Sequence, residues 1–512
     1  MTSFHKPSKS SFPWFGVSMI GLLGFSLTLR FWGLDRFNTL VFDEVYYAKF
    51  AHNYLSQTRF FDGHPPLSKY IIAVGMWLGN QLPFGQAVKN GLTGGLYAPW
   101  TYRWINALVG GFIPLVSAGI AYQLLQRRSY ALIAGVFAAL DGLFLVESRY
   151  ALNNVYLVIL GLVGWWCLLL ALNCRGVNRV GWLILAGMGF GSAVAIKWNG
   201  LWFLLGAYGL WILAQGLHWL QQRDRHLHPD RDLATESAET LCQTPLQKLL
   251  QLRWWQVGGY LGAIPFLTYA FTWIPHLRLN AKMGFWQDFW ALQGEILSYH
   301  NRVGSGPDVH PYCSNWYSWL VMWRPVAYFY RITGKGDPLP SEHVLPPLSA
   351  EKVIYDVHAM GNPFLWWFST LAIALVLALA LGLMVQLVIE QRRSSQSRSF
   401  TLFATSIWGV SPAEQWLVLF LAVNYLANLL PWVRVARCIF LYHYMGASVF
   451  ASLALAWLVD RWLGSDRSDL RYIGMIVIGL VGLAFVFWMP IYLGLPLSPM
   501  EFQLRMWLRS WV

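Results

Sequence analysis

The chain has 512 residues, of which 56% are hydrophobic and only 12% are charged. An average soluble domain has about 25% charged residues and could not solvate so much apolar surface, so this composition excludes an ordinary soluble protein and indicates an integral membrane protein. The net charge of +13 is scattered, and many basic residues flank apolar runs, which favours contact with the lipid bilayer over binding of nucleic acid.

Long apolar runs predict about eleven transmembrane helices, because a span needs roughly 20 apolar residues. The runs cover residues 12–32, 103–125, 130–146, 154–172, 181–196, 201–220, 257–274, 363–389, 414–430, 438–459 and 473–488. Loops with arginine pairs, such as Arg127-Arg128 and Arg392-Arg393, should lie in the cytoplasm under the positive-inside rule. Residues 1–11 resemble the start of a signal peptide, but no cleavage site is obvious after the first run. We therefore expect an all-α membrane protein with a cytoplasmic N-terminus, an uncleaved first helix and an external C-terminus.

Two long segments between these runs are predicted to be external. In the first, residues 33–100, the apolar run 67–82 is short and contains Lys69, so we expect an interfacial or re-entrant helix entered through Pro65-Pro66. The second, residues 275–360, is rich in Trp, Tyr, His, Pro and Gly, which suits a folded loop at the membrane interface. We expect an N-terminal catalytic module (1–274), an external loop (275–360) and a C-terminal membrane module (361–512).

The cysteine and histidine spacings suggest neither a disulfide framework nor a metal site. The five cysteines are isolated, and no CxxC pair exists. His226 and His228 could form a metal pair in the charge-dense stretch 221–253, but no other ligand type is organised around them, so a solvated loop is predicted.

Ionisable side chains gather on the predicted external side. They are Asp43, Glu44, Asp62, His64, Arg103, Glu147, Arg149, Lys197, Arg434, Arg437 and His443. Carboxylates beside a bilayer are costly unless they are paired, solvated or used. Arginines bind phosphate without losing their charge, and a carboxylate beside them can act as a general base. The pattern predicts an anionic, lipid-linked substrate with its headgroup at the outer interface.

Several stretches together resemble the protein O-mannosyltransferase family of multispanning C-type glycosyltransferases. They are Phe42-Asp43-Glu44-Val45, Phe61-Asp62-Gly63-His64-Pro65-Pro66, Tyr102-Arg103-Trp104, Glu147-Ser148-Arg149, Lys197-Trp198-Asn199-Gly200, Arg324-Pro325-Val326, Gly361-Asn362-Pro363 and Phe440-Leu441-Tyr442-His443-Tyr444. Each stretch alone is weak, but they occur in the family's order from residue 42 to residue 444. The ordered set is specific.

The resemblance implies an inverting transfer of mannose from polyprenyl-phosphate-mannose to Ser or Thr hydroxyls of secreted or membrane proteins in extended form. By this likeness Asp43 is the catalytic base, Glu44 helps to bind acceptor or donor, and Arg103 meets the donor phosphate. Other expected substrate contacts are Asp62, His64, Arg149, Lys197, Arg437 and His443, and a structural role for His64 stays open. We expect no cofactor and no metal, because arginines can neutralise the phosphate, and no nucleic acid partner.

The departures from the family pattern qualify this expectation. Residues 275–360 are too few for the β-trefoil insertion of eukaryotic members, which implies a bacterial-type member in the plasma membrane with an external active site. Asn153-Asn154 stands where the family often has an acidic residue, and Tyr46-Tyr47 where relatives often carry His. Two alternatives stay open: a related transferase that uses another lipid-linked sugar or acceptor, and a transporter of a lipid-linked sugar. A transporter would be expected to carry ionisable residues near the bilayer midplane or a repeated half.

Overall fold

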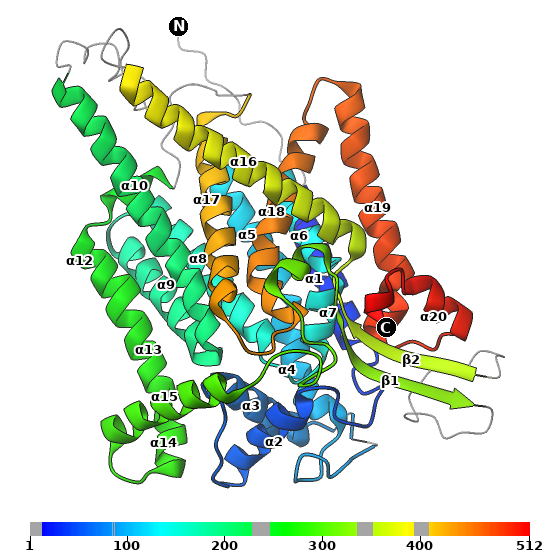
Figure 1. Cartoon of the computed structure of the whole chain (residues 1–512). Helices are drawn as coiled ribbons and strands as arrows, with labels where there is room; N and C mark the ends of the chain where they lie inside the picture. The colour runs from blue at the N-terminus through cyan, green and yellow to red at the C-terminus, as the bar shows by residue number, and fades with distance from the viewer. Residues whose placement is uncertain (1–12, 84, 87, 228–245, 335–351, 394–408) are drawn as a thin grey trace, which may run out of the picture.

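A bundle of long helices forms most of the protein, with short elements gathered at one end (Figure 1). The computed structural model describes residues 13–83, 85–86, 88–227, 246–334, 352–393 and 409–512. Within these ranges, ten helices are long and apolar enough to cross a membrane, or eleven if one bent pair counts as a span. The predicted number of spans is confirmed. The expectations for residues 1–11 and for His228 lie outside the described residues.

The spanning elements follow the predicted runs closely. Some spans join consecutive elements: α4 (Pro99–Gly111) joins α5 (Ile113–Leu125), and α6 (Arg128–Ala139) joins α7 (Gly142–Arg149). A further span consists of α12 (Trp254–Gln256), the π-helical stretch η4 (Val257–Ala263), α13 (Ile264–Thr272) and α14 (Ile274–Asn280). The other spanning helices are α1 (Trp14–Phe31), α8 (Asn154–Asn173), α9 (Gly176–Ile196), α10 (Leu201–Leu227), α16 (Pro363–Arg393), α17 (Pro412–Leu429), α18 (Met445–Leu463) and α19 (Ser468–Leu493). The innermost window, Leu441–Leu463, is 89% buried, whereas that of the first span is 22% buried. The windows that contain α8 and α17 are 78% and 72% buried, so α8, α17 and α18 supply the centre of the bundle.

The third predicted span is broken rather than continuous. Helices α6 and α7 meet at an angle of 58°. The Asp141 carboxylate causes the break, because it accepts hydrogen bonds from the backbone N–H groups of Leu143 (2.8 Å) and Phe144 (3.1 Å) and so caps a new helix. This break places Glu147, Ser148 and Arg149 on a short, fully buried helix beside the gathered short elements.

Four helices lie together at the end of the bundle below the long spans in Figure 1. They are α2 (Glu44–Leu55), α3 (Leu67–Gln81), α14 and α15 (Phe285–Arg302). The predicted short helix at residues 67–82 is present as α3, and it buries Ile72 and Met76 completely. The His276 backbone N–H donates to the Tyr70 hydroxyl at 2.9 Å, which joins α14 to α3. We call this region the α2 end.

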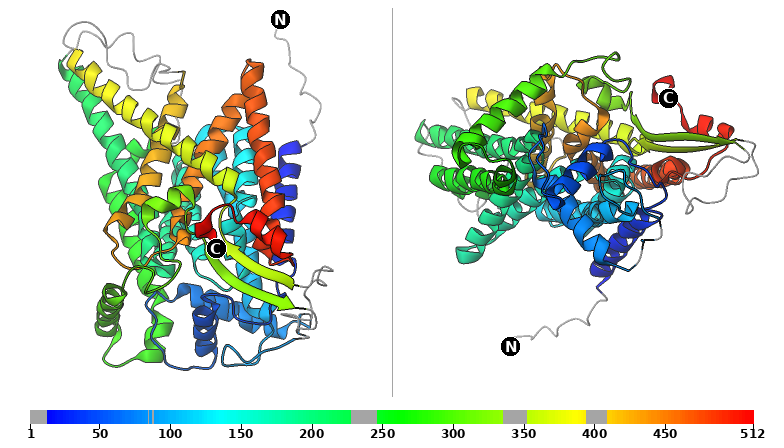
Figure 2. Two further views of the ribbon diagram at one scale, coloured as in Figure 1. Left: turned by 45° about the vertical axis from the view of Figure 1, so that its right-hand side comes forward. Right: turned by 90° about the horizontal axis from the view of Figure 1, so that it is seen from below.

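The segment 275–360 also contains a β-hairpin that the sequence analysis did not predict. Strands β1 (Val326–Gly334) and β2 (Lys352–Ala359) pair antiparallel, with a register shift between Ala327 and Phe329. The hairpin reaches outward beside the C-terminal helix α20 (Pro499–Arg505), as both views in Figure 2 show. The fold class is nevertheless confirmed, because helices make up most of the described chain.

The remaining short elements connect these parts. They are η1 (Trp198–Gly200), η3 (Gln247–Gln251), η5 (Trp316–Val321), η6 (Leu430–Arg434), η7 (Leu441–Tyr444) and η8 (Arg509–Trp511). The C-terminal η8 packs back onto η5, because the buried Trp511 indole N–H donates to the Met322 carbonyl at 2.9 Å. Segments distant in sequence thus meet where η5 and η8 pack together.

Candidate active site

Asp43 stands directly before α2, at the junction where the chain enters this helix. The preceding Phe42 has a φ of +51°, which is unusual for a residue other than glycine, and its ring stacks on Tyr328 at 4.2 Å. The half-buried Asp43 carboxylate caps no backbone N–H and accepts no hydrogen bond from any other described residue. Burial raises the pKa of Asp43 to about 6, the nearby Lys197 opposes this shift, and Asp62 adds to it. Strained backbone and an unused carboxylate are frequent at functional sites.

The neighbouring Glu44 is sequestered in a buried ion pair with Arg103. Glu44 Oε1 accepts from Arg103 Nε at 2.9 Å, and Oε2 accepts from Nη2 at 2.8 Å. The same carboxylate also accepts from the backbone N–H groups of Val41 (2.7 Å) and Ala151 (2.8 Å). Both side chains are 0% exposed. Adjacent acids therefore have different environments, as predicted, but Glu44 has no open side toward a ligand.

Arg103 likewise has no donor left for a phosphate. Besides Glu44, its guanidinium donates to the carbonyls of Leu34 (3.0 Å), Phe37 (3.0 Å) and Thr39 (2.7 Å). All five N–H groups of the guanidinium are thus used within the protein. We therefore revise the predicted phosphate contact: Arg103 is a positioning residue that holds the loop in front of Asp43.

Arg149 and Asp62 also act on the protein rather than on an open site. Arg149 is buried and donates to the carbonyls of Leu29 (2.8 Å), Arg30 (3.1 Å) and Gly33 (3.0 Å), at the end of α1. Asp62 pairs with the buried ammonium of Lys69, which also donates to the carbonyls of His64 and Pro65. These bonds give both residues a positioning role, and their predicted substrate contacts stay predictions. The Lys69 contacts shape the turn that carries His64.

A basic pocket of about 380 Å³ opens at the α2 end. Its lining includes the cations Lys197, Arg434 and Arg437 and the histidines His64, His300 and His443, and it contains no carboxylate. Burial and neighbouring cations lower the pKa of His64 well below its usual range, and burial and Arg437 lower the pKa of His300 to about 4. His64 and His300 are therefore neutral near pH 7, and the pocket's positive charge comes from the lysine and the arginines. We call it the cation pocket.

The cation pocket brings together four of the predicted substrate-binding residues. These are His64, Lys197, Arg437 and His443, from three separate stretches of the chain. His300, which comes from α15, was not predicted. Its tilted contact with His64, with ring centroids 5.2 Å apart, could not be read from sequence because no motif surrounds it. A pocket of this size and charge fits an anionic headgroup.

A chain of polar side chains holds Lys197 at the pocket wall. The Lys197 ammonium donates to Asn154 Oδ1 at 2.9 Å, and Asn154 Nδ2 donates to Glu147 Oε1 at 3.1 Å. The Tyr328 hydroxyl of β1 donates to the same Glu147 oxygen, whereas Glu147 Oε2 is buried without a partner among the described residues. Asn154 thus connects the Glu147 carboxylate to the Lys197 ammonium.

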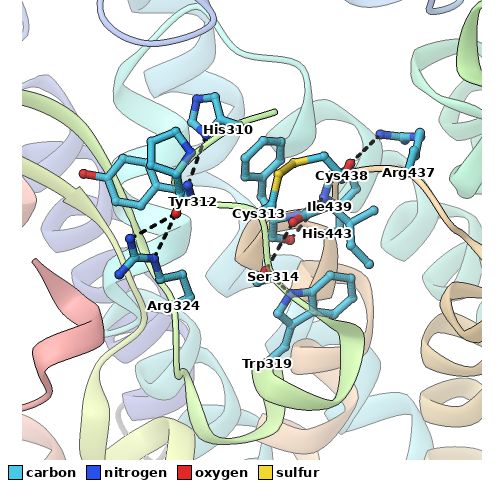
Figure 3. Close-up of a disulfide and its surroundings, with 12 residues drawn as sticks. His310, Tyr312, Cys313, Ser314, Trp319, Arg324, Arg437, Cys438, Ile439 and His443 are labelled. Carbon is cyan, nitrogen blue, oxygen red and sulfur yellow. Dashed lines mark hydrogen bonds between the residues drawn. A yellow bond between two sulfur atoms is a disulfide. The ribbon is translucent and has the colours of Figure 1, made fainter. Parts of the chain in front are cut away.

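Cys313 and Cys438 form a disulfide beside the cation pocket (Figure 3), although the cysteine spacings had suggested no disulfide framework. The bridge joins the segment before η5 to the segment that carries Arg434 and Arg437. The Ser314 N–H donates to the Ile439 carbonyl at 2.8 Å, and the Cys438 N–H donates to the Gly304 carbonyl at 2.8 Å. The two cysteines are 125 positions apart in the sequence, so their spacing carried no signal.

Removing the disulfide should loosen the pocket. For Cys438→Ser we expect a loss of about 2–4 kcal/mol in stability, because a long loop is released in the unfolded chain. We also expect a higher KM for the lipid donor, because Arg437 is adjacent to the bridge. Thermal unfolding and donor titration of the purified full chain measure both effects. The free Cys174 provides the control, since Cys174→Ser should change neither; a Cys438→Ser variant with wild-type KM would contradict the positioning role.

The described residues contain no group of three or more His, Cys, Asp or Glu side chains that could hold a metal ion. The expectation that catalysis needs no metal stays a prediction.

Comparison with known proteins gives the family. The profile described as dolichyl-phosphate-mannose-protein mannosyltransferase matches residues 20–279, and that of the C-terminal four TMM region of protein-O-mannosyltransferase matches residues 285–511. The polyprenol-phosphate-mannose–protein mannosyltransferase of Mycolicibacterium smegmatis is 23% identical to this chain over 92% of it and 88% of that protein. The protein of the same name from Mycobacterium tuberculosis is 22% identical over 97% and 92%.

A solved structure shows the same fold. The Saccharomyces cerevisiae protein O-mannosyltransferase Pmt1-Pmt2 complex bound to the sugar donor aligns with a TM-score of 0.72 and 14% identity, over 99% of this chain and 93% of that one. Together with the two profile matches, which cover most of the sequence, these likenesses agree with the motifs at the α2 end. The chain therefore belongs to the dolichyl-phosphate-mannose-protein mannosyltransferase family and is a multispanning membrane glycosyltransferase.

Proposed function

We propose that this protein transfers mannose, with inversion, from a polyprenyl-phosphate-mannose donor to Ser or Thr hydroxyls of extended segments of secreted or membrane proteins. One observation carries the proposal: the Asp43 carboxylate, which has no hydrogen-bond partner in the described part of the chain, lies close enough to the cation-pocket residue Lys197 for their charges to interact. The donor names of the mycobacterial relatives support the choice of substrate.

The proposed reaction divides the work between Asp43 and the cation pocket. Asp43 takes the proton of the acceptor hydroxyl as its oxygen attacks the sugar C1 on the face opposite the phosphate. The bond between C1 and the phosphate oxygen breaks, and Lys197, Arg434 and Arg437 stabilise the charge that develops on the phosphate. Phosphate is a good leaving group, so no general acid is needed. His64, His300 and His443 line the same pocket and are proposed to contact the sugar or phosphate as neutral donors.

The Cys313–Cys438 disulfide supports an external location for the site. Disulfides persist in oxidising compartments and are rare in the cytosol. With bacterial relatives, this favours the plasma membrane of a bacterium, with the α2 end facing outward.

The assay for this function uses the purified full chain with labelled polyprenyl-phosphate-mannose and a Ser/Thr peptide. We expect labelled, α-linked mannopeptide with the Ser/Thr peptide and none with a matched peptide in which Ala replaces Ser and Thr. A glucose-bearing donor tests the choice of sugar, and donor movement across vesicles without peptide labelling would indicate a transporter. Transfer to lipid but not to peptide would contradict the proposed acceptor.

The raised pKa of Asp43 predicts a pH dependence. Because the base must be deprotonated, kcat/KM should rise with pH through about 6 and level off above it, whereas an unperturbed carboxyl would be ionised well below this range. His64 and His300, whose pKa values are lowered, should not contribute to this limb. A pH profile of the wild type and of the exposed-acid control Asp466→Asn should show the same limb. A rate that is constant from pH 5 to pH 7 would argue against Asp43 as the base.

A further inference from the structure

Two adjoining pockets at the α2 end share one arginine and lie apart from the cation pocket. A polar pocket of about 570 Å³ lies between the end of α2 and α14, and an apolar pocket of about 460 Å³ lies between α13, α14 and the start of α15. Arg278 lines both, and neither shares a residue with the cation pocket. We call this pair of pockets the α14 crevice.

The polar half of the crevice carries two cations with no partner of their own. Arg59 and Arg278 are exposed, and neither makes a hydrogen bond or ion pair with any other residue in the described ranges. The wall behind them is fixed, because the Tyr54 hydroxyl is hydrogen-bonded to His276 Nδ1 at 2.7 Å and the Tyr70 hydroxyl accepts from the His276 N–H. No carboxylate lines this half, so its charge is complementary to an anion.

The apolar half opens on the lipid-facing side of a membrane span. Leu267 and Phe271 of α13 and Trp286 of α15 line it, and they are 46%, 62% and 53% exposed. Its one acid, Asp288, accepts from the backbone N–H groups of Lys282, Met283 and Gly284, and these bonds lower its pKa. Asp288 is thus occupied within its own turn and does not neutralise Arg278.

The crevice and the cation pocket lie toward opposite ends of α15. The crevice is lined by Phe285, Trp286 and Asp288, and the cation pocket by the stretch from Leu297 to Val303. Nine residues of helix, from Asp288 to Leu297, span roughly 13 Å. A donor that has its single phosphate in the cation pocket cannot also place it against Arg59 and Arg278.

We propose that the α14 crevice is a binding site for an anionic phospholipid of the surrounding bilayer. The phosphate and charged headgroup lie between Arg59 and Arg278, and an acyl chain occupies the apolar half against Phe271 and Trp286. The membrane depth fits, because Arg278 lies near the end of the span Trp254–Asn280. This site goes beyond the proposed glycosyl transfer and does not depend on it. Because α2 begins beside Asp43 and ends at the crevice, the lipid braces the helix whose other end carries the catalytic base.

Native mass spectrometry of the purified full chain tests the site directly. With equimolar dioleoyl phosphatidylglycerol and phosphatidylcholine, we expect the wild type to retain the anionic lipid about tenfold more than the zwitterionic one, since each basic residue near an anionic membrane surface adds several-fold affinity. The Arg59→Gln/Arg278→Gln double variant should fall below about twofold preference. Arg302→Gln, an exposed arginine of α15 that lines neither pocket, is the matched control and should keep the wild-type preference.

Three further arms identify the ligand. Soluble glycerol 3-phosphate in millimolar excess should leave the bound phosphatidylglycerol in place; its displacement of the lipid would mean a headgroup-only anion site and overturn the proposal. Polyprenyl phosphate at an equal concentration should not compete, and competition would assign the crevice to the donor instead. Phe271→Ala/Trp286→Ala should lower retention of phosphatidylglycerol, and unchanged retention would also overturn the proposal, as would equal retention of both lipids by the wild type. These readouts need no enzymatic activity, so they are separable from failure of the proposed function.

Discussion

Replacing Asp43 by Asn is expected to lower kcat by about 10²–10⁴-fold and to leave the donor KM nearly unchanged. The substitution keeps the shape of the side chain but removes the base that accepts the hydroxyl proton. Folding should be unaffected, because the Asp43 side chain caps no backbone group and has no hydrogen-bond partner among the described residues. The effect therefore belongs to the chemical step.

Peptide mannosylation and thermal unfolding, measured on the same preparation, separate this outcome from a folding defect. Asp466→Asn, an exposed acid between α18 and α19, is the control and should behave as wild type. If Asp43→Asn transfers mannose at the wild-type rate, the base lies elsewhere. A lowered melting temperature with proportionally lowered rate would instead give Asp43 a structural role.

Replacing Arg103 by Met should destabilise the protein by about 3–5 kcal/mol, because it leaves the Glu44 carboxylate buried without its counter-charge. The loop carbonyls of Leu34, Phe37 and Thr39 lose their donors at the same time. The expected signature is a lower melting temperature with and without donor, accompanied by loss of activity.

The double variant Glu44→Gln/Arg103→Met distinguishes a positioning role of Arg103 from a contact between Arg103 and the donor phosphate. Removing both charges should restore part of the lost stability, since no unpaired ion is then buried. The matched control is Arg434→Met in the cation pocket, an exposed arginine without partners in the described chain, which should raise donor KM and leave the melting temperature unchanged. If Arg103→Met behaves like Arg434→Met, Arg103 does contact the donor.

The spans were predictable from sequence because the bilayer demands an apolar run of fixed length, and this demand leaves a local signal. The break at Asp141 was not, since a single polar residue within an apolar run shows neither whether it caps a helix nor what it pairs with. The hairpin β1–β2 was missed for a related reason. Its two short strands lie outside the apolar runs that predict the spans, and the sequence of either strand alone does not show which segment it pairs with.

The site was predictable in its location but not in the roles of its arginines. The predicted topology puts Arg103, Arg149 and Arg437 on the same side of the membrane, so the sequence does not distinguish them. Only their three-dimensional partners distinguish them, because Arg103 and Arg149 donate to groups within the protein whereas Arg437 lines an open pocket. Asn154 stands where the family often has an acid, and in the structure its amide links Glu147 to Lys197. The sequence alone could not reveal this link, because the three residues lie on separate elements.

The broken third span has a consequence for how the chain enters the membrane during synthesis. Asp141 at the middle of a span costs about 2.5–3.5 kcal/mol during insertion, so α6 and α7 are poor substrates for autonomous entry into lipid. Arg149 offsets this through its three bonds to the carbonyl end of α1, a helix already made when the third span emerges from the ribosome. The broken third span therefore depends on the first for hydrogen-bond acceptors that the lipid could not provide.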